Sequence, residues 1–308
     1  MENKTYSDYF DIDDSYYPEI NPNSMKDPNT RWNQTFPHPT FVKLLHATGR
    51  MLARETGESK KGIWIEGAYG TGKSRVAWTL KSLLECSPHE LDEYFGMYDA
   101  LRGENDLRSK LIAEKQGRIV VAYRYGSGEV TTVSRLVMAV FESITAALKD
   151  AGYDYRGERT IRGRMAAWLA DDVHRQMFEI MAAKPEHCGR GSLANKSVDD
   201  IIGQLSDLER DASELVADIL AVAEAEGIKA FELSMEDLTA WISEVIEENR
   251  LTALVLVWDE FSSFFKNNRT SLDEFQKLAE LASERPFYLM IVTHMAGSLA
   301  SEGDQSFK

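Results

Sequence analysis

The stretch from residue 62 to residue 84 constrains the fold more than any other part of the sequence. A short apolar run, Ile63-Trp64-Ile65, leads into a glycine-rich loop. Apolar residues at helical spacing follow the loop: Val76, Ala77, Leu80, Leu83 and Leu84. This order predicts a hydrophobic strand, a tight turn and an amphipathic helix. Strands that alternate with helices in this way build parallel α/β sheets.

The same alternation returns further along the chain. Apolar runs at 118–125, 253–258 and 287–294 predict three more strands. Helical spacing predicts a helix from Val133 that ends at Gly152, a second that Ser234 caps, and a third that opens with a capping box of Ser271 and Glu274. We therefore expect an α/β fold, a three-layer sandwich with a mainly parallel sheet and an inserted helical segment.

The chain divides into four parts. Residues 1–40 hold five of the eight prolines and many aromatic residues, which predicts an extended arm that docks on the core or, equally well, a poorly ordered terminus. Residues 41–152 and 228–308 carry the α/β pattern, and residues 153–227 form a helical insertion. Within the insertion, apolar residues at spacings of four and three predict a bundle or helical hairpin: Ile201, Leu205, Leu208, Ala212, Leu215, Ile219 and Val222.

Composition narrows the classes of function. The 308 residues carry a formal charge of −15, which repels phosphate backbones at long range, so nucleic acid would need a local basic patch or a partner. The two cysteines fit a reducing compartment. The N-terminus lacks an apolar signal core, and the longest apolar run, 253–258, is too short to span a bilayer. We expect a soluble cytoplasmic protein that makes no membrane contact.

The glycine loop has the residues of a phosphate-binding loop. The pattern G-x-x-x-x-G-K-S spans residues 67–74, and its glycines let successive backbone N–H groups point inward to hold phosphate oxygens. Lys73 can reach the outer phosphates, and the Ser74 hydroxyl can bind Mg²⁺. The predicted nucleotide-binding residues are Gly67, Ala68, Tyr69, Gly70, Thr71, Gly72, Lys73, Ser74 and Arg75.

Acidic residues end a neighbouring strand. Asp259 and Glu260 follow the run "LVLVW", where Asp259 can hold the metal shell and Glu260 can polarise an attacking water. The last strand ends with Thr293 and His294, either of which could contact the outer phosphate or that water. The predicted cofactors are ATP and Mg²⁺, with Ser74 and Asp259 as metal residues and Lys73, Glu260, Thr293 and His294 as catalytic residues.

The motifs "GAYGTGKS", "LVLVWDE" and "LMIVTH" resemble Walker A, Walker B and sensor-1 of the P-loop ATPases of the additional-strand, catalytic-glutamate type. That group includes the AAA+ and STAND proteins, and the resemblance covers roughly 41–150 and 228–300. "YGTGKS" with "WDEF" also resembles the large ATPases of bacterial phage-defence systems such as BREX and phage-growth-limitation loci. The resemblance implies ATP hydrolysis coupled to conformational change, a homo-oligomer with nucleotide near a subunit interface, and a protein partner.

The sequence departs from that family after His294. No arginine occurs in the last fourteen residues, so we expect either that a partner supplies the arginine finger and the C-terminal lid or, as we favour, that the chain is the N-terminal part of a larger protein. ATP is favoured over GTP because no guanine-reading motif is evident, and we expect residues 39–42 to lie near the base.

Other interpretations stay open. The same motifs suit a low-turnover switch or scaffold that oligomerises and presents a partner effector; a small-molecule kinase is disfavoured because it needs no water-activating glutamate. A cluster of arginines could contact nucleic acid, although a salt-bridged surface is favoured: Arg156, Arg159, Arg162 and Arg164. Arg285 could face a neighbouring subunit or merely end a helix. A zinc site at His187 and Cys188 is disfavoured because further ligands at suitable spacing are absent.

Overall fold

The computed structural model describes residues 20–21, 24–25, 27, 30–54, 62–126, 130, 132–153, 159–187, 189, 191–207, 210–228, 234–261 and 272–294. Within these residues, four parallel strands form one sheet in the order β1-β4-β3-β2. The strands are β1 (Gly62–Glu66), β2 (Ile119–Tyr125), β3 (Ala253–Asp259) and β4 (Phe287–Thr293). The predicted α/β fold with a parallel sheet is confirmed.

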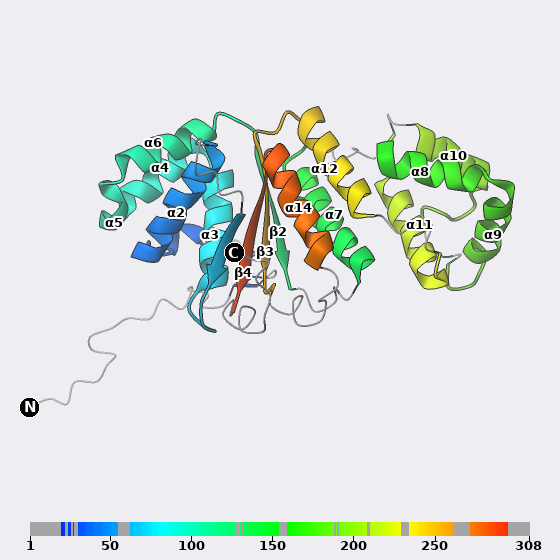
Figure 1. Cartoon of the computed structure of the whole chain (residues 1–308), viewed down its shortest axis with the longest axis horizontal. Helices are drawn as coiled ribbons and strands as arrows, with labels where there is room; N and C mark the ends of the chain where they lie inside the picture. The colour runs from blue at the N-terminus through cyan, green and yellow to red at the C-terminus, as the bar shows by residue number, and fades with distance from the viewer. Residues whose placement is uncertain are drawn as a thin grey trace, which may run out of the picture.

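Helices cover both faces of the sheet (Figure 1). One face carries α2 (Pro39–Leu52), α3 (Lys73–Glu85), α4 (Pro88–Met97), α5 (Asp99–Arg102) and α6 (Asn105–Glu114). The other face carries α7 (Val133–Asp150), α12 (Met235–Glu248) and α14 (Leu272–Glu284). The result is a three-layer sandwich.

A hydrophobic core lies on each face of the sheet, and the central strands contribute residues to both cores. All seven residues of β3 are buried, and neighbours along the strand point to opposite faces. Val255 and Val257 pack with the helices of the α3 side, whereas Leu254 and Leu256 pack with those of the α7 side. A continuous apolar run such as "ALVLVW" is what a parallel strand needs when helices cover both of its faces.

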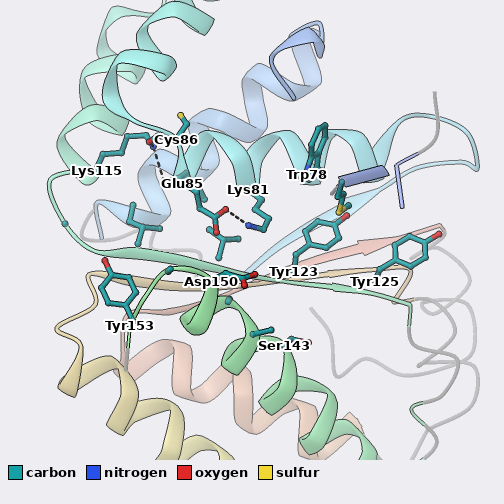
Figure 2. Close-up of a pocket in the computed structure, with 18 of the residues that line it drawn as sticks. Trp78, Lys81, Glu85, Cys86, Lys115, Tyr123, Tyr125, Ser143, Asp150 and Tyr153 are labelled. Atoms are coloured by element: carbon teal, nitrogen blue, oxygen red, sulfur yellow. Dashed lines mark hydrogen bonds and ion pairs between the residues drawn. The ribbon is translucent and has the colours of Figure 1, made fainter. Parts of the chain in front are cut away.

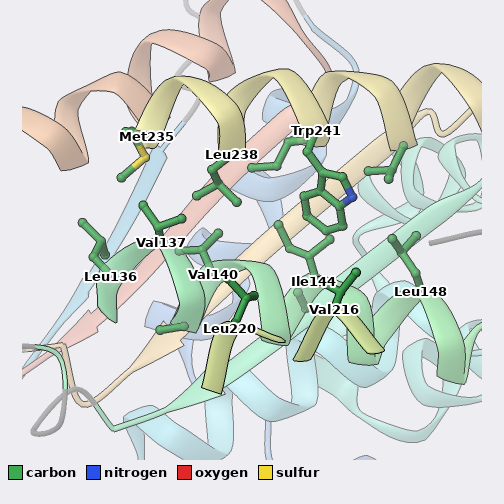
Figure 3. Close-up of a cluster of buried hydrophobic side chains, with 14 of the residues drawn as sticks. Leu136, Val137, Val140, Ile144, Leu148, Val216, Leu220, Met235, Leu238 and Trp241 are labelled. Carbon is green, nitrogen blue, oxygen red and sulfur yellow. The ribbon is translucent and has the colours of Figure 1, made fainter. Parts of the chain in front are cut away.

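The core on the α7 side joins the sandwich to the helical insertion. Figure 3 shows Val140 and Ile144 of α7 beside Leu238 and Trp241 of α12, with Val216 of the insertion at the same cluster. The helix α12 begins at the predicted cap, because the Ser234 hydroxyl accepts a bond from the Asp237 N–H in a capping box. The proposed cap at Ser271 lies outside the described residues.

The insertion consists of α8 (Arg159–Ala170), α9 (Asp172–Ala182), α10 (Val198–Ser206) and α11 (Ser213–Glu226), which lie beyond α7 and α12 (Figure 1). The predicted stripe is shared between α10 and α11, so the bundle or hairpin interpretation is confirmed over the free coiled coil. Six stripe residues are buried, and Leu208 lies outside the described part: Ile201, Leu205, Ala212, Leu215, Ile219 and Val222.

Arg162 explains why the stripe breaks between α10 and α11. Its guanidinium is fully buried and donates to the carbonyls of Leu205, at 2.8 Å, and Arg210, at 3.0 Å, as well as to those of Gln204 and Asp207. Gln204 and Leu205 lie in the last turn of α10, where the end of a helix leaves carbonyls unsatisfied, and Asp207 and Arg210 follow that turn. Arg162 is therefore a buried internal cap, and its assignment to an exposed arginine cluster is wrong.

The other arginines of interest form ion pairs or lie outside the description. Arg164 pairs with Asp237 of α12, and Arg285 pairs with Glu247 of the same helix. Arg156 and the side chain of Arg159 lie outside the described part of the chain. The ion pair at Arg285 agrees with the simpler interpretation of a charge at a helix end.

Part of the N-terminal region packs on the core. The 3-10 helix η2 (Trp32–Gln34) precedes the buried Thr35, and the Trp32 ring lies 5.4 Å from that of Tyr94. The Tyr94 hydroxyl donates to the Thr35 carbonyl at 2.6 Å. Docking is thus confirmed for residues 30–38, while the aromatic residues before position 20 lie outside the described chain. No helix of the described part is both long and apolar enough to cross a bilayer.

Candidate functional site

The predicted site residues gather at one edge of the sheet. Because all four strands are parallel, their carboxyl ends meet at the same edge, where ligands of open α/β sheets bind. The glycine loop leaves β1 there, Asp259 and Glu260 end β3, and His294 follows β4. The register pairs Glu66 of β1 with Thr293 of β4. Residues separated by more than 200 positions in sequence are thereby brought together.

The loop between β1 and α3 adopts a conformation that depends on its glycines. Gly70 and Gly72 have φ values of 76° and 80°, in the left-handed region that residues with a side chain avoid. Gly72 is also the N-cap of α3, so the helix begins at Lys73 as predicted. The Thr71 hydroxyl and the Lys73 ammonium both donate to the Ala68 carbonyl at 2.8 Å, which closes the loop on itself.

Lys73 and Ser74 face the acidic end of β3. Lys73 is 8% exposed, and burial lowers its pKa, while the negative charges of Glu260 and Asp259 act in the opposite direction. The Ser74 hydroxyl lies close enough to the Asp259 carboxylate to lower the pKa of that group. The first turn of α3 and the end of β3 are therefore neighbours.

Asp259 is a buried carboxylate, and each of its two oxygens accepts a hydrogen bond. It is 1% exposed, and it accepts bonds from the Tyr123 hydroxyl at 2.8 Å and from the Glu260 N–H at 2.9 Å. Burial raises the pKa of Asp259 despite these donors and the Ser74 hydroxyl. Burial and the Asp259 charge also raise the pKa of Tyr123 well above its usual value, which keeps its hydroxyl protonated as a donor.

Glu260 lies in an unusual backbone conformation. Its φ is 59°, a left-handed value that is strained for a residue other than glycine, asparagine or aspartate. The Glu260 carboxylate lies 2.6 Å from Nε2 of His294, and the two side chains are 28% exposed. The His294 ring in turn lies 5.3 Å from the ring of Tyr69 in the glycine loop. The turn after β3 thus aims Glu260 at the loop side of the edge.

The structure separates the two candidates at the end of β4. Thr293 is 1% exposed within the strand, whereas His294 reaches the Glu260 carboxylate. Arg75 differs from its predicted role at a phosphate, because its guanidinium donates to the Thr35 hydroxyl at 3.2 Å and to the Arg31 carbonyl at 3.4 Å. With 7% exposure, the Arg75 side chain fastens α3 to the N-terminal segment.

A cavity that the sequence did not indicate lies along β2. Its volume is about 710 Å³, it runs between α3 and α7, and Trp78, Tyr125 and Tyr153 are among its lining residues (Figure 2). An ion pair of Lys81 and Glu85 crosses one wall. Lys73, Asp259 and Glu260 do not line this cavity. It is therefore separate from the loop, although Tyr123 borders both.

Comparisons with protein-family models, with curated proteins and with solved structures found no match to this chain.

Proposed function

We propose that the chain is a P-loop ATPase of the additional-strand, catalytic-glutamate type. It binds ATP at the carboxyl edge of the sheet and couples nucleotide state to conformational change or assembly. The observation that carries the proposal is the proximity of Lys73 and Ser74, at the start of α3, to the Asp259 and Glu260 carboxylates. A phosphate loop and an acidic strand end that lie this close together have the parts of a nucleotide site.

The strand order supports the same assignment. β4 lies between β1, which leads into the loop, and β3, which ends in the acidic pair. An inserted strand of this kind is what the additional-strand group is named for. Its end contributes His294, which contacts Glu260. The oligomeric state, the effector partner and a role in phage defence rest on the sequence resemblance alone.

The residues at the edge fit Mg²⁺ and a triphosphate. The Ser74 hydroxyl and the Asp259 carboxylate are hard oxygen ligands of the kind that Mg²⁺ prefers. When bound, the cation would neutralise charge on the phosphate oxygens. Lys73 would exchange the Ala68 carbonyl for a phosphate oxygen, and the N–H groups at the start of α3 would donate to the same anion.

Glu260 is the proton acceptor in this proposal. The oxygen of a water bonds to the outer phosphorus as the bond to the ADP oxygen breaks, and the water proton passes to the Glu260 carboxylate. His294 holds that carboxylate at 2.6 Å and so restricts where it points. The strained, left-handed backbone of Glu260 also restricts the direction in which its side chain points.

One observation favours a second candidate function, the low-turnover switch or scaffold. A Glu260 carboxylate already bonded to His294 has part of its accepting capacity occupied. A chain that keeps this pair when ATP binds would hold the nucleotide and turn it over slowly. The fate of bound ATP in a Glu260 variant separates the two functions.

The test is phosphate release with Mg-ATP by the wild type, Lys73→Ala and Glu260→Gln, combined with the mass in solution with and without nucleotide. We expect Lys73→Ala to weaken ATP binding, and Glu260→Gln to lower turnover about 100-fold while ATP stays bound. A switch instead predicts slow release by the wild type that Glu260→Gln leaves unchanged.

Two variants serve as matched controls. Lys81→Ala removes another lysine of α3, which pairs with Glu85. Glu104→Gln breaks another histidine–glutamate pair, with His46 at 2.9 Å, away from the loop. Both should release phosphate like the wild type. If the wild type fails to bind ATP, or if Lys73→Ala binds and releases as the wild type does, the proposed function is wrong.

A further inference from the structure

We propose that Tyr123 is a positioning residue for the metal site, whose hydroxyl holds the Asp259 carboxylate in the orientation that a bound Mg²⁺ requires. Tyr123 lies on β2, opposite Val257 of β3, and its hydroxyl donates to the Asp259 carboxylate at 2.8 Å. No motif of the sequence indicated this residue. The role assigned to Tyr123 rests on the proposed function, because the cation would arrive with the nucleotide.

A donor holds each oxygen of the Asp259 carboxylate. The Tyr123 hydroxyl donates to Oδ2, and the Glu260 N–H donates to Oδ1 at 2.9 Å. A carboxylate oxygen offers two lone pairs, so each oxygen can accept one further partner. Turning the carboxylate would weaken both hydrogen bonds at once. The two donors therefore fix its direction before a cation binds.

Tyr123 acts on the face of the sheet that carries the helix of the phosphate loop. Val257, its partner in the register, belongs to the core on the α3 side, and Tyr123 packs against that core. The Ser74 hydroxyl, in the first turn of α3, lies beside Asp259. The donor from β2 and the proposed Mg²⁺ ligand from α3 therefore lie beside the same carboxylate on one face of the sheet. Hydrogen bonds from a second group to a metal ligand are how proteins orient such ligands.

A purely structural role for this hydrogen bond makes a different prediction. Asp259 is 1% exposed, so the Tyr123 hydroxyl could merely satisfy a buried charge. Loss of the hydroxyl would then lower the melting temperature and leave the affinity of folded chains for the cation unchanged. A positioning role predicts instead that the affinity for the cation falls, while nucleotide binding without the cation stays the same.

The experiment uses the full chain, as wild type and as Tyr123→Phe, with a non-hydrolysable ATP analogue. Mn²⁺ serves as the probe for Mg²⁺, because electron paramagnetic resonance distinguishes its free and bound forms. We expect Tyr123→Phe to weaken Mn²⁺ binding to the complex of chain and analogue by about 10–100-fold. Calorimetry with a chelator present should give the wild-type affinity for the analogue, and excess Mg²⁺ should restore part of the lost ATP turnover.

Tyr153→Phe is the matched control. Tyr153 lies toward the other end of the cavity along β2 (Figure 2), so the change removes a tyrosine hydroxyl away from Asp259. This variant should bind Mn²⁺ as the wild type does. Tyr123→Met also lacks the donor but keeps an apolar side chain, and it gives a second test if Tyr123→Phe does not fold.

Failure of the proposed function and failure of the role of Tyr123 give different results. A wild type that does not bind the analogue contradicts the proposed function and, with it, the role of Tyr123. A wild type that binds both the analogue and Mn²⁺, with Tyr123 variants that keep its affinity for Mn²⁺, overturns the role of Tyr123 alone. Equal weakening of analogue binding with and without the cation would show a structural role and would overturn it as well.

Discussion

The two ends of the sheet differ although the same strands form both. At the amino end, backbone groups join neighbouring segments: Thr252 N–H donates to the Arg118 carbonyl at 2.9 Å, and Leu254 N–H donates to the Pro286 carbonyl at 2.8 Å. At the carboxyl end, a buried carboxylate and a buried lysine lie beside a residue with left-handed φ. The comparison suggests that one end stabilises the fold while the other holds polar groups ready for a ligand.

The largest expected effect is at the carboxyl end. Ser74→Ala removes the hydroxyl beside Asp259 that is the proposed Mg²⁺ ligand, so we expect phosphate release to fall roughly 100-fold. Melting temperature should change little, because the site is not where the fold gains its stability. Turnover and thermal melting on the same preparation check this.

Ser82→Ala is the matched control for that change. Ser82 lies on the same helix, and its hydroxyl donates to the Trp78 carbonyl at 3.0 Å. The variant should keep full turnover. Equal losses of turnover in the two variants would show that any change in α3 impairs the protein. The proposed difference between the two ends of the sheet would then have no support.

At the amino end we expect a smaller effect, which lowers the stability of the fold and leaves turnover unchanged. A Cβ added at Gly117 would lie 2.2 Å from Oγ1 and 2.7 Å from Cβ of Thr252, so one segment must move. We expect Gly117→Ala to lower the free energy of unfolding by about 2 kcal/mol. ATP turnover per folded molecule should be unchanged. Denaturant unfolding and turnover measure the two quantities.

Gly103→Ala controls for the loss of a glycine. Its added Cβ meets nothing within 4 Å, and its φ of −84° suits any residue. This variant should be as stable as the wild type or slightly more so. A Gly117→Ala chain that unfolds normally but loses turnover would reverse the assignment of the two ends.

The smallest expected change is one of stability, and it has an unusual sign. Burial raises the pKa of Asp259 in the folded state, so ionised Asp259 destabilises the fold at neutral pH. Asp259→Asn should therefore raise the free energy of unfolding by roughly 1 kcal/mol at pH 7, while it abolishes turnover. The gain should shrink as pH falls through the folded pKa and vanish below the unfolded value of about 3.9.

Melting scans across pH test this prediction, with Asp106→Asn as control. Asp106 is exposed in the first turn of α6, so its variant should show a small difference that does not follow pH in the same way. A less stable Asp259→Asn at pH 7 would mean that the ionised carboxylate is needed to hold the Tyr123 hydroxyl, which donates to it at 2.8 Å.

Sequence alone predicted the sheet because the signals are local. Each strand is a short apolar run beside glycine or polar residues, and β3 is apolar throughout since both of its faces are covered. The loop from Gly67 to Ser74 was likewise readable from spacing. The helices α4–α6 were missed, although Ser87 and Glu90 form a capping box, with Pro88 as the first helical residue, that could have predicted the first of them.

Contacts between distant segments could not be predicted. The pair of Glu260 and His294 depends on the relative register of β3 and β4, which no local pattern encodes. Arg162 reads as a surface charge in a basic run, yet it caps α10 from inside. His187 was considered with Cys188 in sequence, whereas its neighbour in space is Glu226, 39 positions away. Side-chain partners of this kind require the packing of the helices.

The attachment of the N-terminal segment to α3 has a practical consequence for shortened forms of the protein. A chain that began at Phe41 would keep nearly all of α2, which begins at Pro39. It would nevertheless strip Thr35 from Arg75 and from Thr79, whose hydroxyl lies 2.7 Å from that of Thr35. A buried guanidinium would be left without those partners one residue after Ser74. Failure of such a fragment to bind nucleotide would then report on the cut and not on the loop.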